Sequence, residues 1–241
     1  SVVREGSKHA LLEAIYDPQQ PGSLAGNIRH LMWSATHVRE RLSLDHWHSL
    51  NRLQREQQQA QKTHPTLTEA IAFLDRVLGV SSSLTGFAMD NMPRDDGWRF
   101  LVVGRRLERL SFLALAIANF LRMPSARGAG CLESLLELTD SIITYRSRYS
   151  RSPELLPVLD LLVFDDSNPH GVVFQASVLA RYLDRKAREL GEANEGELAE
   201  ALDHLLHFDL KKLEHSHFSD CHECASCQEM ARLLEALNGA A

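Results

Sequence analysis

The sequence has 241 residues, 44% of them hydrophobic and 24% charged, with a formal net charge of -6. These proportions are typical of a globular protein, and the excess of acidic residues excludes the strongly basic surface that nucleic-acid binding usually requires. The longest apolar stretch, residues 110–121, is interrupted by Ser111 and Asn119 and is too short to span a bilayer. We therefore expect a protein that binds neither nucleic acid nor a membrane.

All predicted elements before residue 95 are helices, because no short stretch alternates as a strand does between hairpin turns. Ser23 and Ser43 are suitable N-cap residues, and Thr66 with Glu69 forms a capping-box pattern. Together with the turn at 17–22 they delimit four helices: residues 8–16, 23–42, 43–53 and a helix starting at 66. The polar run 54–62 is either a solvated helix end or a flexible connection.

The longest predicted helix follows residues 92–97 and ends at Met123-Pro124. Ser167 or Asn168 is expected to cap a later helix that begins near Pro169. The remaining helical segments cover residues 132–149, 155–164, 169–183, 195–217 and 221–237. The sequence therefore predicts an all-α fold, a single bundle of about eight to ten helices forming one domain over residues 1–241.

The long helix that follows residues 92–97 carries two apolar stripes, so we expect it to lie at the centre of the bundle. The first stripe consists of Phe100, Val103, Leu107, Leu110, Ala114 and Ile117. The second consists of Leu101, Gly104, Glu108, Phe112 and Leu115. Glu108 is therefore expected on a mostly buried face, where a carboxylate needs a cationic partner. Arg105, Arg109 or an arginine from elsewhere in the chain could supply it.

Two interpretations of Glu108 and its arginines stay open. The first is a structural ion pair that holds helices in register. The second is a site that binds an anion or a carboxylate, because the planar guanidinium group of arginine suits both. A complete autonomous active site is not visible, since no phosphate-binding loop, nucleophile elbow or His-Glu-x-x-His pattern occurs.

A Cys/His-rich segment covers residues 215–227, which we expect at the periphery of the domain. Its thiols and imidazoles are the ligands that zinc prefers, and the candidate ligands are Cys221, Cys224, Cys227, His217 and His222. A reactive or disulfide-forming thiol pair and the absence of any special role are the alternatives. With Cys131 standing alone, the cysteines do not form a secreted disulfide framework, which favours a cytoplasmic location.

Several motifs together resemble the Alpha-E domain, a bacterial helical family named for its Glu-Arg motif. The matching stretches are residues 38–43 with Trp47 and 50–51, 97–100, 104–109, 143–149, and 168–169 with 174–175. The resemblance covers nearly the whole chain. The Cys/His-rich segment is a departure from the family pattern.

The resemblance implies an association with ATP-grasp and transglutaminase-like proteins in amide-bond formation or peptide modification. Stand-alone members begin with an extra helix bearing its own Glu-Arg motif, and no such segment precedes Ser1. The opening at 22–25 instead resembles the version attached to a circularly permuted ATP-grasp domain. We therefore expect the chain to be a fragment or a shortened form of such a fusion.

The leading hypothesis is a helical accessory module that binds a partner ATP-grasp ligase and an acidic or phosphorylated substrate. The candidate substrate-binding residues are Arg105, Glu108, Arg109, Tyr145, Arg146, Arg148, Asn168 and Gln175. For Tyr145 the alternative role is packing, and for Asn168 it is helix capping. The alternative function is a metal-binding protein or enzyme that uses the Cys/His-rich segment, and whether the chain is an enzyme stays open.

Overall fold

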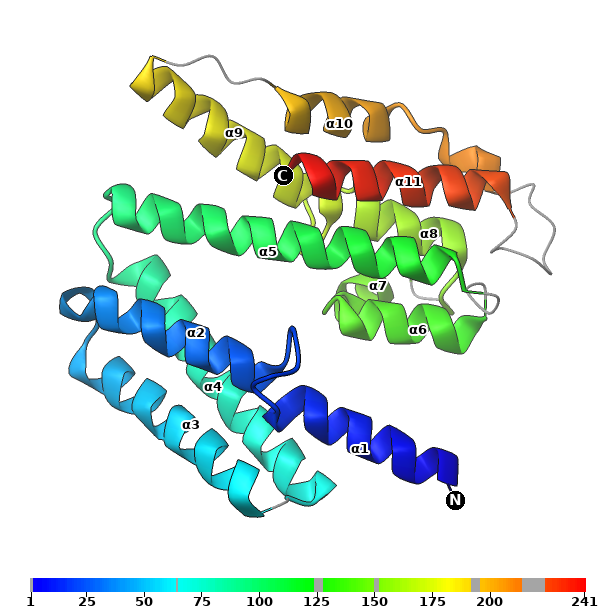
Figure 1. Ribbon diagram of the computed structural model, residues 1–241. Coiled ribbons are helices and arrows are strands. Elements are labelled where there is room, and N and C mark those ends of the chain that lie inside the picture. The colour runs from blue at the N-terminus through cyan, green and yellow to red at the C-terminus, as the bar shows by residue number, and fades with distance from the viewer. Residues whose placement is uncertain (1, 64, 124–127, 150–151, 192–195, 214–223) are drawn as a thin grey trace. The chain divides into compact units, whose positions relative to one another are not determined.

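The computed structural model describes residues 2–63, 65–123, 128–149, 152–191, 196–213 and 224–241. These residues form eleven α-helices and three short helical segments, and no strand occurs among them (Figure 1). The all-α prediction is confirmed. The number of helices slightly exceeds the expected eight to ten.

The chain divides into two compact units, Ser1–Arg94 and Asp95–Ala241. The single-bundle arrangement is therefore not confirmed. The elements of the first unit are α1 Val2–Tyr16, α2 Leu24–His37, the 3-10 turn Arg39–Arg41, α3 Leu44–Thr63 and α4 Leu67–Asp90.

The second unit begins with the long helix α5, Asp96–Leu121. The elements that follow are α6 Ala129–Leu138, α7 Ile142–Tyr149, α8 Leu155–Leu159, the π-helical turn Asp160–Phe164, α9 Val172–Leu190, α10 Glu197–Leu206, the 3-10 turn Leu210–Leu213 and α11 Ala225–Ala240. The apolar segment predicted at 155–164 thus becomes α8 and the π-helical turn.

Side-chain caps start several helices where the sequence indicates. The Ser23 hydroxyl accepts a hydrogen bond from the Gly26 amide at 3.1 Å, and Thr66 and Glu69 form the complete capping box. The predicted cap of α9 is wrong: the N-cap is Gly171, and Pro169 precedes the helix. The Asn168 side chain instead accepts from the His170 amide at 3.0 Å and donates to the Leu161 carbonyl at 2.9 Å. It therefore holds the turn before α9 together.

One further boundary differs from the prediction, and for the run 54–62 the structure has the first of the two predicted alternatives, a helix end. The helix expected to run through Leu42 ends at His37 and is followed by a 3-10 turn. The polar run 54–62 is helical to its end, because α3 reaches Thr63. Most of this run is solvated, but its inward side contributes the buried Gln57.

The core of the first unit joins all four of its helices. It consists of Tyr16, Ile28, Met32, Ala35, Leu50, Leu53, Ala70 and Phe73. By length and composition alone, α4 could cross a membrane, although one such helix is weak evidence for a span. The absence of a membrane partner stays a prediction.

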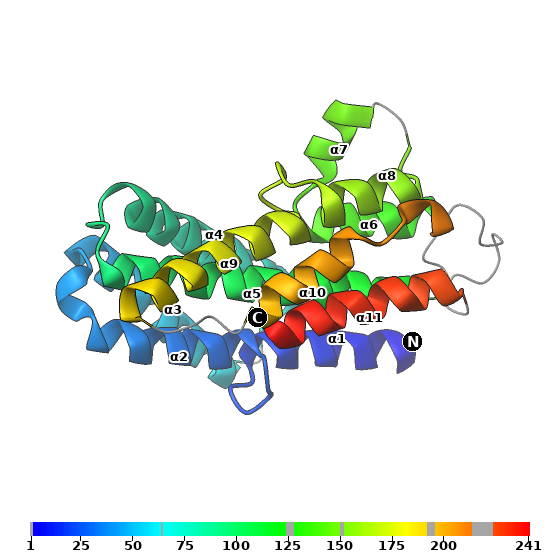
Figure 2. The same cartoon turned by 90° about the horizontal axis from the view of Figure 1, so that it is seen from above.

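The core of the second unit forms around α5, which packs mainly against α9 and α11. Figure 2 shows α11 running alongside α5. Leu110, Ala114 and Ile117 of the first predicted stripe are completely buried, whereas Phe100 at its beginning is exposed. The second stripe is not buried, since Phe112 is 47% exposed and Leu101 and Leu115 are also exposed. Only one side of α5 therefore contributes to this core.

Candidate functional site

Helix α5, whose N-cap is Asp95, carries Arg105, Arg106 and Arg109 on two successive turns. Arg105 and Arg109 are exposed and Arg106 is half-buried. Among the described residues, no carboxylate lies within ion-pair distance of these three guanidinium groups. Three cations therefore lie close together, and none of them is neutralised by an ion pair within this part of the structure. We call Arg105, Arg106, Arg109 and His170 the cationic cluster.

The turn before α9 brings residues more than sixty positions away in the sequence to these arginines. The Arg106 guanidinium donates to Gln175 Oε1 at 3.0 Å and lies over the Phe174 ring, 5.2 Å from its centroid. The Gln175 side chain is fully buried, and its amide nitrogen donates to the carbonyl of Pro169. Gln175 thus fixes Arg106 to the turn.

His170 lies between an arginine and an acid. Its Nδ1 is 3.4 Å from Arg109 Nη1, and its Nε2 is 3.7 Å from Asp140 Oδ2. Because a guanidinium only donates hydrogen bonds, Nδ1 accepts from Arg109. In neutral His170 the proton then lies on Nε2, facing the Asp140 carboxylate.

The positive charges of the cluster repel one another. Burial, followed by repulsion from neighbouring arginines, lowers the pKa of Arg105 and of Arg106. Burial, followed by the charge of Arg109, lowers the pKa of His170, and the carboxylate of Asp140 opposes this only in part. His170 is therefore mainly neutral at pH 7, and the three arginines carry the positive charge of the cluster. An anion bound among them would relieve their mutual repulsion.

Of the predicted substrate-binding residues, the structure brings Arg105, Arg109, Asn168 and Gln175 together around the cationic cluster. Tyr145 is completely buried, and its hydroxyl accepts from the Glu154 amide at 3.2 Å and donates to the Ser152 carbonyl at 3.4 Å.

Two more predicted residues are engaged in ion pairs. Arg146 pairs with Glu133 at 2.5 Å, and Arg148 pairs with Asp165. These contacts hold the second unit together. A substrate-binding role for Tyr145, Arg146 and Arg148 stays a prediction.

The expectation that Glu108 lies on a buried face is wrong. Its side chain is exposed, and no described residue forms a hydrogen bond or ion pair with it. The physical reason is that α5 packs against α9 and α11 through the stripe containing Leu110 and Ile117. Glu108 belongs to the other stripe, so neither arginine beside it is needed to neutralise a buried charge.

The predicted metal ligands are not brought together within the described part of the chain. Cys227 is completely buried beside Met230 and Leu234 in the core, and Cys224 is half-buried at the N-cap of α11. His217, Cys221 and His222 lie outside the described residues. No group of three potential metal-binding side chains occurs among the residues that the structure describes.

The sequence reasoning missed two members of the cluster, Arg106 and His170. Arg106 belongs to the same run as Arg105 and Arg109, so the density of arginines was the signal for it. His170 directly follows Asn168-Pro169, but nothing in its own position indicates an arginine neighbour. Only the packing of the α9 turn on α5 brings it there.

The fold and the site define an all-helical protein with arginines gathered on its longest helix. The chain belongs to the Alpha-E family, whose model, a predicted alpha-helical domain with a conserved ER motif, matches residues 3–240. The resemblance seen in the motifs is thereby confirmed. Glu108-Arg109 is one Glu-Arg pair of this chain and Glu40-Arg41 another.

The chain is similar to uncharacterized proteins of Mycobacterium bovis and of two strains of Mycobacterium tuberculosis. Each is 29% identical over 230 residues, which are 92% of this chain and 25% of the relative. The chain therefore spans about a quarter of the length of these curated relatives. No solved structure matches it.

Proposed function

We propose that the protein is a helical accessory module of an ATP-grasp-linked system for amide-bond formation or peptide modification, and that its cationic cluster holds an anionic group of the substrate. The observation that supports this proposal is that none of the three arginine side chains forms an ion pair with a carboxylate of a described residue. Guanidinium groups bind carboxylates and phosphates through paired hydrogen bonds.

The start of α9 adds to this positive environment. The N-cap Gly171 has no side chain to occupy the free amide groups of the first turn, and α9 continues for 19 residues. A helix N-terminus favours negative charge. His170 precedes this N-terminus and contacts Arg109, so the helix start and the arginines favour the same kind of ligand.

Binding of an acidic peptide tests the role of the cluster. We expect the double variant Arg105→Gln/Arg109→Gln to bind tetraglutamate about tenfold more weakly than the original chain, since each charged hydrogen bond contributes about 1.5–3 kcal/mol before screening by solvent. Both side chains are exposed, so helicity should not change. Isothermal titration calorimetry measures the affinity, and circular dichroism measures the helicity.

The matched control is Arg181→Gln, which removes an exposed arginine from α9 eleven residues after His170. Its affinity for tetraglutamate should equal that of the original chain. If the double variant and the control bind equally well, the cluster is not the anion site.

The association with an ATP-grasp ligase rests on the family resemblance. Co-expression of the chain with an ATP-grasp ligase should give a complex that survives purification. Ligase activity that is the same with and without the chain would contradict the accessory role.

His170 should make anion binding depend on pH. Its pKa in the free protein is below the ordinary value of about 6.5, and an anion beside Arg109 favours the imidazolium form. We therefore expect tetraglutamate affinity to rise as the pH falls from about 7 to about 5.5, where glutamate is still ionised. The variant His170→Gln should show a flatter profile in the same calorimetric titrations.

The stability of the free protein should change with pH in the opposite direction. The native state binds a proton on His170 more weakly than the unfolded state does. Neutral His170 therefore contributes to the free energy of unfolding above about pH 6.5, and this contribution is lost as the pH falls toward the lower pKa of the folded state.

A pH profile of affinity that is identical in His170→Gln would exclude His170 from the anion site.

A further inference from the structure

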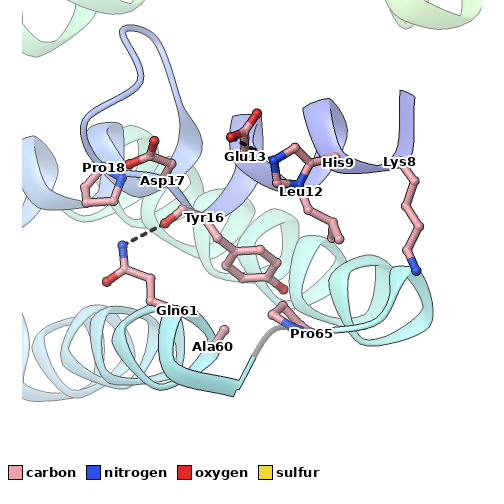
Figure 3. A pocket seen from close by; sticks show the side chains of 10 residues that line it. All are labelled: Lys8, His9, Leu12, Glu13, Tyr16, Asp17, Pro18, Ala60, Gln61 and Pro65. Carbon is pink, nitrogen blue, oxygen red and sulfur yellow. Dashed lines mark hydrogen bonds and ion pairs between the residues drawn. The ribbon is translucent and has the colours of Figure 1, made fainter. Parts of the chain in front are cut away.

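A cleft of about 580 Å³ lies within the first unit, and no residue of the cationic cluster lines it. Figure 3 shows it between α1, the turn that follows α1, the end of α3 and the chain entering α4. It is lined by Lys8, His9, Leu12, Glu13, Tyr16, Asp17, Pro18, Ala60, Gln61 and Pro65. Pockets of this volume hold small molecules or short peptides.

Tyr16 forms the floor of the cleft and is only 6% exposed. Its ring stacks on Phe73 with the centroids 5.5 Å apart, and its backbone carbonyl accepts from Gln61 Nε2 at 2.7 Å. The hydroxyl forms no hydrogen bond with any described residue, and Figure 3 shows it near Pro65. The hydroxyl faces the cleft, so a ligand atom or water can take up its hydrogen bond there.

Burial is the main cause that raises the pKa of Tyr16, and the charge of Arg76 opposes it in part. The hydroxyl therefore stays protonated at neutral pH and can donate a hydrogen bond. A ligand that meets it must present an acceptor, such as a peptide carbonyl.

The two ends of the cleft carry opposite charges. Lys8 is exposed at one end, and no described carboxylate lies within ion-pair distance of it. Asp17 is half-buried at the other end, where one carboxylate oxygen accepts from the Gln19 amide at 2.9 Å and the other is available. Glu13 lies 3.2 Å from His9 on the next turn of α1 and forms an ion pair with it when the imidazole is protonated. Lys8 and Asp17 are thus the two charges at the ends of the cleft.

The distance between these charges matches a short peptide. Nine residues of helix separate Lys8 from Asp17, a rise of about 13 Å, and four extended residues span about 13 to 14 Å. Between them the lining is mainly apolar, with Leu12, Ala60 and Pro65 around the Tyr16 ring.

We infer that this cleft binds a short peptide of about four residues with free termini and apolar central side chains. Its ammonium group pairs with Asp17, its carboxylate pairs with Lys8, and one of its carbonyls accepts from the Tyr16 hydroxyl. The central side chains pack on Leu12 and Pro65. This inference does not depend on the cationic cluster, which lies in the other unit.

The test uses the full chain and four tetrapeptides, Gly-Leu-Leu-Gly, Gly-Phe-Phe-Gly, Gly-Pro-Leu-Gly and Gly-Ala-Ala-Gly. Each is used with free termini and in a form with an acetylated amine and an amidated carboxylate. We expect at least one free peptide to bind with a Kd below about 1 mM and its blocked form to bind about tenfold more weakly, because two charged contacts are lost. Calorimetric titration gives the affinities.

Three variants separate the contacts. Lys8→Gln should weaken binding of the free peptide and leave binding of the blocked form unchanged. Asp17→Asn should have the same effect, and the asparagine side-chain oxygen can still accept the hydrogen bond from the Gln19 amide. Tyr16→Phe keeps the ring on Phe73 and should weaken both forms. Lys62→Gln, an exposed lysine of α3 outside the lining, is the matched control and should change neither.

Circular dichroism verifies that each variant is folded. If no free peptide binds below about 1 mM, or if the free and blocked forms bind equally, the cleft is not a peptide site. The same holds if Lys62→Gln weakens binding as much as Lys8→Gln does.

Discussion

Leu110→Ala should lower the free energy of unfolding of the second unit by about 3 kcal/mol, the usual cost of a cavity left by a buried leucine. Leu110 is completely buried on the side of α5 that packs against α9 and α11. The remaining core is closely packed and cannot fill the space fully. Urea unfolding followed by circular dichroism measures the change.

Leu101→Ala is the matched control, because it removes the same atoms from the other stripe of the same helix. Leu101 is 40% exposed, so the expected loss is about 1 kcal/mol or less. Equal losses for Leu101→Ala and Leu110→Ala would show that both sides of α5 are buried. That result would restore the sequence-based expectation for Glu108.

Gly171→Ala should destabilise the second unit by about 1–3 kcal/mol, as overpacking usually does. A Cβ atom at this position would lie 3.1 Å from the Asn168 carbonyl oxygen and 3.2 Å from that of Asp165. Both oxygens are held in the turn, since Asn168 O accepts from the Gly171 amide at 2.8 Å and Asp165 O accepts from the Asn168 amide at 3.3 Å. Thermal unfolding measures the loss.

The same substitution should also weaken tetraglutamate binding, because the turn that it displaces carries His170. Gly104→Ala is the matched control on α5, where no atom of a neighbouring residue lies within 4 Å of the added Cβ. Alanine raises helix propensity by about 0.8–1 kcal/mol over glycine, so this variant should be as stable as the original or more so. A destabilised Gly104→Ala would show that a neighbour packs against this position.

The helices of this protein were largely predictable because their signals are local. The Thr66 capping box and the Ser23 cap depend on residues three positions apart, and both form as predicted. The apolar stripe through Leu110 and Ile117 likewise depends only on helical spacing. The cap of α9 was misplaced because Asn168 had two possible roles, and hydrogen bonds within the turn favoured the one that is not a cap.

The candidate site was predictable only where its members are neighbours in the sequence. Arg105 and Arg109 lie one turn apart on a helix, so their proximity follows from helical geometry alone. The contact of Arg109 with His170 depends on how α9 packs against α5, and helical periodicity contains no information about that packing. Glu108 shows the same limit, since spacing places it beside Phe112 but cannot say whether that stripe is covered.

The amino-acid pattern was thus sufficient for the helical class and for most helix starts, because both depend on short-range spacing. The family followed from the resemblance of motifs along nearly the whole chain. Packing between helices that are distant in the sequence decided the division into two units and the exposed position of Glu108. It also decided the hydrogen bond between Arg106 and Gln175 and the cleft that Tyr16 lines. These features arise when side chains from different helices compete for the same buried space. Local sequence does not encode the outcome of that competition.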